Sequence, residues 1–226
     1  MFSTLAKNEN AHEQGIWSLK WHQQHLITGG ADGVVKVWDS QLKELNCFKH
    51  HSLSILNVDA YNNKAISHSF DGTFCCFDLE TGNVQKTLEF APVDCFHTQI
   101  SKDLIARTAH DGSITIMDFN GVTKYKLQGK KDVFVFSCCF SNDGKKLAAG
   151  YKDGTVAIFD VETQKLLHSI SVHENTVRQV VVSPNQEYLI TASYDKKTAI
   201  IDLYFFIHLV NMVILLQRML LTLLGY

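Results

Sequence analysis

The sequence predicts an all-β protein in which one small antiparallel sheet is repeated along the chain. The first observation is a nine-residue phrase that recurs: ADGVVKVWD at 31–39, FDGTFCCFD at 70–78, HDGSITIMD at 110–118, KDGTVAIFD at 152–160 and YDKKTAIID at 194–202. The second is the spacing of 39, 40, 42 and 42 residues between the turn aspartates Asp32, Asp71, Asp111, Asp153 and Asp195. A constant period of this length is typical of a stacked supersecondary unit.

Each phrase has the pattern of a hairpin, because Asp-Gly between two apolar runs favours a tight turn. In the first repeat, Val35 and Val37 share one face of the second strand, and Lys36 and Trp38 share the other. Further strands are expected upstream, at 16–21, 55–61, 133–140 and 177–182, and downstream, for example at 43–48 and 164–170. A sheet of four short strands that is apolar on both faces needs a neighbour on each face. Radial stacking of such sheets gives a β-propeller.

Composition narrows the range of functions. The 226-residue chain has a formal net charge of −2, which argues against direct nucleic-acid binding or a basic membrane-surface patch. None of its six cysteines forms C-x-x-C, and the adjacent pairs Cys75-Cys76 and Cys138-Cys139 point to opposite faces of a strand. We therefore expect buried free thiols, no metal site and no cofactor. Residues 1–10 lack the apolar stretch of a signal peptide.

No sequence motif indicates catalysis. The chain contains no phosphate-binding loop, no G-x-S-x-G and no H-E-x-x-H. Ser69, His51 and Asp71 have the composition of a hydrolase triad, but Ser193, His173 and Asp195 repeat it. Two copies in one chain favour a structural role, so we expect no catalytic residues and a non-enzymatic protein.

The period, the Asp-Gly turn and the closing aromatic-Asp pair resemble the WD-repeat family. Trp38-Asp39 is the literal pair, and Phe77-Asp78, Met117-Asp118, Phe159-Asp160 and Ile201-Asp202 are degenerate versions. The resemblance covers residues 11–203, preceded by an N-terminal segment at 1–10 and followed by an apolar tail at 204–226. It implies a propeller whose ring closes with seven blades, of which five are recognisable here.

The resemblance also implies a hydrogen-bond network in which a histidine about 20 residues before the turn Asp binds that Asp and a strand Ser or Thr. His12, His51 and His173 fit this position. The expected sets are His51 with Ser69 and Asp71, and His173 with Ser193 and Asp195. In the first repeat, Gly30 stands where the serine is expected, so the network of His12, Asp32 and Trp38 is predicted to be incomplete. The third and fourth repeats lack the histidine.

The geometry of the family gathers loops on two flat faces, where partners dock. Two rows are expected on one face: the residue before each turn Asp, and a residue at the start of each first strand. The first row is Ala31, Phe70, His110, Lys152 and Tyr194. The second row is Trp17, Leu56, Asp94, Phe136 and Arg178. All except Ala31 and Leu56 are candidate partner-binding residues, since aromatic side chains and Arg are typical interface anchors. The alternative is that some, especially Leu56 and Phe136, pack between blades.

Within the family, three segments resemble WD-repeat subunits of the superkiller complex, which in animals also belong to the polymerase-associated elongation factor complex. The segments are AHEQGIWSLKW at 11–21, APVDCF at 91–96 and the stretch 141–196. This resemblance implies a scaffold, in the nucleus and cytoplasm, that binds a tetratricopeptide protein and a helicase in 3′–5′ mRNA decay, without direct RNA contact. A WD-repeat scaffold of an unrelated assembly is the alternative.

The tail departs from the repeat pattern. Residues 204–226 are apolar and carry one charge, Arg218. Three interpretations are open: translated non-coding sequence or an alternative exon, a membrane anchor with Lys196 and Lys197 on the cytoplasmic side, or a native tail packed on the open edge of the propeller.

Overall fold

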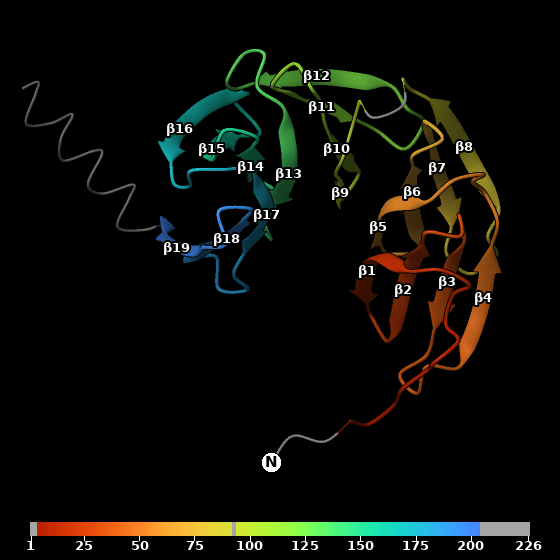
Figure 1. The fold of residues 1–226 in the computed structure, drawn as a ribbon. Coiled ribbons are helices and arrows are strands. Elements are labelled where there is room, and N and C mark those ends of the chain that lie inside the picture. Colours follow the sequence, from red (N-terminus) through yellow and green to blue (C-terminus); the bar gives the residue numbers. More distant parts are fainter. Residues whose placement is uncertain (1–3, 92–93, 204–226) are drawn as a thin grey trace, which may run out of the picture.

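The computed structural model describes residues 4–91 and 94–203 and consists of β-strands joined by turns. Five sheets stand side by side in an arc, with their first strands toward its inner side (Figure 1). The first and last sheets end the arc on either side of its opening (Figure 1). The prediction of an all-β propeller arrangement with five repeats is confirmed, but the described residues form five sheets and not the seven that the resemblance implies for a closed ring.

Within each sheet the strands follow sequence order, and neighbours are antiparallel. The first sheet contains β1 (Ile16–His22), β2 (His25–Gly30), β3 (Val35–Trp38) and β4 (Glu44–Phe48). The second contains β5 (Ile55–Tyr61), β6 (Lys64–Ser69), β7 (Thr73–Asp78) and β8 (Val84–Glu89). The third contains β9 (Thr98–Ser101), β10 (Leu104–Thr108), β11 (Ser113–Met117) and β12 (Thr123–Gln128). The fourth contains β13 (Val135–Phe140), β14 (Lys146–Tyr151), β15 (Thr155–Asp160) and β16 (Lys165–Ser171). The last contains β17 (Val177–Val182), β18 (Tyr188–Ser193) and β19 (Thr198–Asp202).

The core lies between sheets rather than inside any one of them. Ile27 and Val35 of the first sheet are fully buried against Ile55 and Val58 of the second. The middle strands β6, β7, β10, β11, β14 and β15 are buried along nearly their whole length, whereas the outer strands β4, β8, β12 and β16 are mostly exposed. Each sheet therefore depends on its neighbours for burial of its apolar faces.

The turn glycine is required by the backbone. Gly154 has φ of +86°, and a Cβ there would collide with the carbonyl oxygen of His173. Glycine is the residue that adopts this left-handed conformation without a steric cost. In the last repeat Lys196 stands at the corresponding place with φ of +70°.

The last sheet differs from the prediction of four strands per repeat. It has three strands within the described residues, which end at Leu203. Residues 204–226, to which the three interpretations of the tail apply, lie outside the described part of the chain. None of the helices that the structure describes has the length and apolar character needed to span a membrane.

Opposite effects on stability are expected at the two turn positions. Gly154→Ala should lower the free energy of unfolding by about 1–3 kcal/mol, since it adds both backbone strain and a steric clash. Lys196→Gly should raise it by up to about 1 kcal/mol, because it relieves a left-handed lysine. Urea titration measures both, with Gly15→Ala as the control, since a Cβ at Gly15 meets no atom closer than 3.6 Å.

Candidate interaction surface

Backbone hydrogen bonds bring the two predicted rows together. The N–H of the residue before the turn Asp donates to a carbonyl just before the first strand of the same sheet. The distances are 2.7 Å for Ala31 to Gly15, 3.0 Å for Phe70 to Ser54, 2.9 Å for Lys152 to Phe134 and 3.0 Å for Tyr194 to Thr176. Residues of the two rows therefore lie side by side on one face of the arc.

A β-bulge directs the second row. Ile16 pairs with Gly30 and Ser18 pairs with Gly29, so Trp17 is the extra residue in β1. The same irregularity occurs in β5, β13 and β17, where the extra residues are Leu56, Phe136 and Arg178. Bulges re-aim side chains out of the regular pleat. Four predicted positions of this row thus share one local geometry.

Aromatic rings join the rows into a continuous surface. Trp17 and Phe70 meet edge to face at 5.6 Å between ring centroids, and Phe70 lies 6.4 Å from Phe96. Phe96 stacks on Phe136 at 4.8 Å and contacts Phe134 at 5.1 Å. We call these five residues the aromatic row. It runs across the first four sheets, and Trp17 is 54% exposed.

The aromatic row borders a cavity of about 410 Å³ on the inner side of the arc. Trp17, Leu56, Phe96 and Arg178 all line it. Arg178 is exposed and has no hydrogen-bond or ion-pair partner among the described residues. His97 also lines the cavity, and burial lowers its pKa to about 4. This site combines apolar rings with one uncompensated cation, which is the composition of a protein-binding surface.

Asp94 does not occupy the position predicted for the third sheet. The turn between β9 and β10 has two residues, Lys102 and Asp103, as in the first two sheets, whereas the turn between β13 and β14 is longer. The residue equivalent to Trp17 is therefore Phe96. Asp94 instead contacts His110 of the other row at 2.5 Å, and Arg107 at 3.8 Å.

The other predicted residues differ in their exposure. His110 and Lys152 are exposed, and Tyr194 is 58% exposed on the last sheet. Phe136 and Leu56 are half-buried, so each side chain packs partly against its neighbours and remains partly exposed on the surface. The prediction missed Phe96 and Phe134. The shorter hairpin of the third repeat was the sequence feature that pointed to Phe96.

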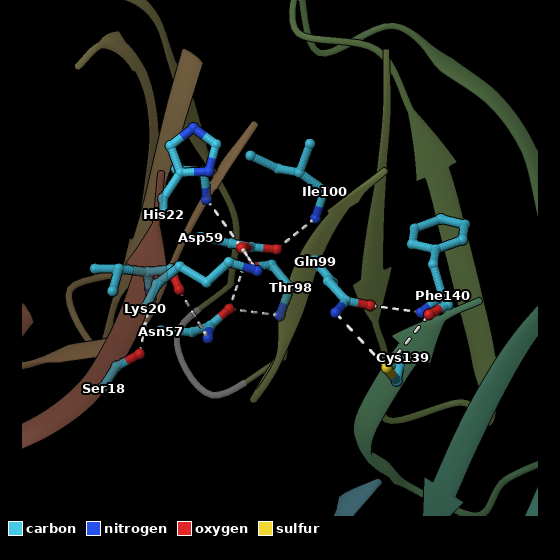
Figure 2. Close-up of polar contacts among 12 residues, drawn as sticks. Ser18, Lys20, His22, Asn57, Asp59, Thr98, Gln99, Ile100, Cys139 and Phe140 are labelled. Atoms are coloured by element: carbon cyan, nitrogen blue, oxygen red, sulfur yellow. Dashed lines mark hydrogen bonds and ion pairs between the residues drawn. The ribbon is translucent and has the colours of Figure 1, made fainter. Parts of the chain in front are cut away.

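Side chains of the inner strands β1, β5 and β9 each bond to the backbone of the next sheet (Figure 2). Ser18 Oγ accepts a hydrogen bond from the Val58 N–H at 3.0 Å, and Asp59 accepts from the Ile100 N–H at 2.8 Å. Gln99 accepts from the Phe140 N–H at 2.5 Å. Each bond satisfies a backbone donor of the next sheet. Hydrogen bonds thus join the inner strands of the first four sheets in sequence.

The first repeat contains a complete histidine network. His12 Nδ1 lies 3.0 Å from Asp32 and Nε2 lies 2.8 Å from Thr28 Oγ1. The Trp38 indole N–H donates to the same hydroxyl at 2.8 Å. The prediction that Gly30 leaves this network incomplete is wrong, since Thr28 supplies the hydroxyl.

In the other two networks as well, the hydroxyl that binds the histidine belongs to a residue two positions before the predicted serine. His51 Nε2 binds Ser67 Oγ at 2.7 Å, and His173 Nε2 binds Thr191 Oγ1 at 2.8 Å. The buried histidine ring reaches the residue four before the turn Asp. Ser69 and Ser193 instead donate to loop carbonyls, of Leu53 at 2.9 Å and Asn175 at 3.0 Å.

The carboxylates of these networks differ in their partners. His173 Nδ1 lies 2.8 Å from Asp195, but His51 lies 3.7 Å from Asp71 and binds Thr73 instead. Burial raises the pKa of Asp71, but hydrogen bonds from Thr73 and Ser52 outweigh burial and hold that pKa well below its usual range. These contacts connect the turn of each repeat to the loop before it, so their role is structural.

The two repeats without the histidine use ion pairs and ring contacts. In the third, Arg107 takes the hydroxyl position, and its guanidinium lies 3.9 Å from the Phe90 ring centroid. In the fourth, Lys130 pairs with the turn carboxylate of Asp153. Lys130 thus takes the place of the histidine in the fourth repeat, whereas Arg107 takes the place of the hydroxyl in the third.

The fold and surface define a β-propeller that presents an interaction face. Residues 3–39 match the family described as "WD domain, G-beta repeat", and residues 99–183 match "Anaphase-promoting complex subunit 4 WD40 domain". The chain is 34% identical over 218 residues to WD repeat-containing protein SL1-17 of Schistosoma mansoni, covering 89% of this chain and 71% of that protein. The chain therefore belongs to the WD-repeat family, whose members are generally non-catalytic interaction scaffolds.

Other similarities cover less of the matched proteins. WD repeat-containing protein VIP3 of Arabidopsis thaliana is 30% identical, over 80% of this chain and 64% of that protein. Superkiller complex protein 8 of Dictyostelium discoideum is 35% identical over 101 residues, which are 42% of this chain and 34% of that protein. Among solved structures, the Myceliophteria thermophila Cps50 (Swd1) β-propeller domain matches with a TM-score of 0.75 at 15% identity, over 84% of this chain and 67% of that one. This last likeness supports the fold alone.

Removing the Thr28 hydroxyl should destabilise the first sheet. Thr28→Val keeps the shape but leaves the buried Trp38 N–H without an acceptor, at a cost of about 1–3 kcal/mol. Urea titration with tryptophan fluorescence measures the loss. Thr198→Val, at an exposed threonine of β19, is the control and should change stability by less than about 0.5 kcal/mol. Equal effects of the two variants would contradict the network.

Stability should fall on acidification from pH 7 to pH 5. Burial lowers the pKa of His51 to about 4 and that of His68 to about 3. An unfolded histidine titrates near pH 6.5, so below that pH the unfolded chain binds more protons than the folded one. Between pH 7 and pH 5, each of the two histidines should lower the free energy of unfolding by roughly 1–2 kcal/mol. Urea titrations at the two pH values measure the loss, and His68→Phe should shrink it by one such increment. An unchanged pH dependence in that variant would rule out the contribution of His68.

Proposed function

We propose that this chain is a scaffold subunit of a superkiller-type complex that supports 3′–5′ mRNA decay, and of the polymerase-associated elongation factor complex. Its partners are a tetratricopeptide scaffold and a helicase in the first assembly and elongation-complex subunits in the second. It works in the nucleus and the cytoplasm. It contributes binding surface and no chemistry, and RNA contacts belong to its partners.

The observation that carries the interaction role is the aromatic row beside Arg178. Exposed Trp17 stands next to half-buried Phe70 and Phe96, so a partner that covers these rings removes apolar area from water without reorganising the face. The backbone below is fixed by strand pairing and by the bonds of Figure 2. A rigid surface of this kind binds with little loss of conformational entropy.

The choice of assembly is supported by the similarity to Superkiller complex protein 8, which extends over 42% of the chain. The alternative is a scaffold of an unrelated assembly. That alternative is supported by the similarity to SL1-17 and VIP3, which extends over more of the chain and links it to no particular complex. Both functions use the same face, so the identity of the captured partners distinguishes them.

Truncating two rings of the predicted face should weaken partner binding without unfolding the protein. In cells, tagged protein carrying Phe70→Ala and Tyr194→Ala should recover at least about tenfold less partner than the native chain, since an anchor residue contributes about 2 kcal/mol. Quantitative mass spectrometry of the purified complexes measures recovery. Native partners should be helicase and tetratricopeptide subunits or elongation-complex subunits.

The control is Tyr61→Ala, at an exposed tyrosine at the far end of β5. It should leave recovery unchanged. Full recovery with the double variant would remove this face from the proposal. Recovery of an unrelated complex through the same face would replace the assignment to superkiller-type assemblies but keep the scaffold role.

A further inference from the structure

Two cations belong to the interaction face at the fourth and fifth sheets. Lys152 precedes the turn Asp of the fourth sheet, and Arg178 is the extra residue of the bulge in β17. Both side chains are exposed, and neither charged group has a hydrogen-bond or ion-pair partner among the described residues. This end of the face therefore carries positive charge that the described part of the chain does not balance.

Neighbouring carboxylates are already engaged. Asp153, the residue after Lys152, pairs with Lys130. Glu174, in the loop before β17, lies 3.3 Å from Lys197. Neither carboxylate is therefore available to neutralise the two cations, so an anion from another molecule is the partner that their charge favours.

Backbone contacts join these cations to the aromatic row. The Lys152 N–H donates to the carbonyl of Phe134, a member of that row, at 2.9 Å. The Lys152 carbonyl accepts a hydrogen bond from Thr176 Oγ1 at 3.0 Å, and Thr176 lies two residues before Arg178. The Tyr194 N–H donates to the Thr176 carbonyl at 3.0 Å. The face is therefore continuous from the apolar rings to the two cations.

The cavity beside the aromatic row brings an apolar wall and a cation together. Trp17, Leu56 and Phe96 line it from the first three sheets, and Arg178 lines it from the last. Among the described residues that line it, Arg178 alone is charged at pH 7, since burial lowers the pKa of His97 to about 4. Its volume of about 410 Å³ accommodates a large apolar side chain next to that charge.

We propose that this face binds an extended segment of a partner protein that carries a large apolar side chain beside an anionic group, either a carboxylate or a phosphate. The apolar side chain fills the cavity between Trp17, Leu56 and Phe96. The anionic group pairs with Arg178 and Lys152, and the Arg178 guanidinium can bind either kind of anion with two parallel hydrogen bonds. This inference rests on the proposed interaction role of the face, but not on the identity of the assembly.

Charge complementarity selects this occupant over a basic or a purely apolar one. A basic segment is repelled by two unpaired cations, and an apolar segment covers them without replacing their hydration. An extended segment also reaches into a concave cavity, where alternate side chains occupy separate subsites. The partner is therefore defined by an anionic group and an apolar anchor on one short stretch of chain.

Selection from a random-peptide phage library tests this chemistry before the partner is identified. The bait is the full 226-residue chain, and sequencing measures the composition of the selected peptides. Asp or Glu beside an aromatic or large aliphatic residue should be enriched at least about fivefold over the unselected library. A bait with Arg178→Glu and Lys152→Glu should lose this preference and favour Lys or Arg instead.

The matched control bait carries Lys86→Glu and Lys165→Glu, at exposed lysines of the outer strands β8 and β16. It has the same net charge as the first variant and should keep the acidic preference. Urea titration verifies that all three baits are folded. No selected peptide on the native chain, or the same acidic preference on the bait reversed at Arg178 and Lys152, would overturn the proposal.

Binding of one selected peptide then identifies the anionic group. The peptide is made with its native acidic residue, with the corresponding amide and with phosphoserine at the same position, and fluorescence anisotropy measures the Kd of each form. The acidic form should bind the native chain at least about tenfold more tightly than the amide form. Tighter binding of the phosphoserine form would assign the site to a phosphate, and weaker binding would assign it to a carboxylate. Equal binding of the acidic and amide forms would contradict the proposal.

Co-purification from cells separates this proposal from the choice of assembly. The chain with Arg178→Glu and Lys152→Glu should recover at least about tenfold less partner than the native chain. If it recovers superkiller or elongation-complex subunits in full while Phe70→Ala with Tyr194→Ala loses them, the anionic segment is refuted and the proposed function stands. Charge-dependent loss of an unrelated complex would support the anionic segment and replace the assembly.

Discussion

The structure depends on one constraint: each sheet is apolar on both faces, so none is stable without a neighbour. Ile27 and Val35 are buried by Ile55 and Val58, and the same arrangement recurs along the arc. Coverage is complete for the inner sheets and partial at the two ends, where Leu19 and Ile200 are 69% and 70% exposed. Stability is therefore a sum of contacts between adjacent sheets, as in other repeat architectures.

The same constraint explains why an interaction face forms where it does. Most side chains of the middle strands are buried between adjacent sheets. The loops and the bulged first strands therefore carry the side chains that are accessible to other molecules. Trp17 and Phe136 are directed by bulges, and Phe70 is held beside Ser54 by a backbone bond. The rings are thus positioned by the elements that define the fold, and they add little strain of their own.

The sequence predicted the repeat, its strands and much of the face, because spacing and alternation report directly on backbone geometry. The sequence pattern misplaced one member of the second row, in the third sheet, where the first hairpin is shorter than in the fourth. The two-residue turn of the third sheet brings Phe96, not Asp94, into the aromatic row. The hydroxyls that bind the histidines belong to Ser67 and Thr191 rather than Ser69 and Ser193. The two candidates in each strand are two residues apart and share a face, so the position of the histidine ring determines which one is bonded. Tertiary packing sets the position of the ring, and the spacing of residues in the sequence does not predict it.

The replacement of histidine by Lys130 in the fourth repeat gives the loops of one face different sensitivities to salt. The Lys130–Asp153 pair is substantially exposed, so dissolved salt weakens its attraction by screening. The His173–Asp195 pair is almost completely buried, out of reach of that screening. Rising salt therefore weakens the contact between Lys130 and the turn of the fourth sheet before it affects the His173–Asp195 contact of the last repeat.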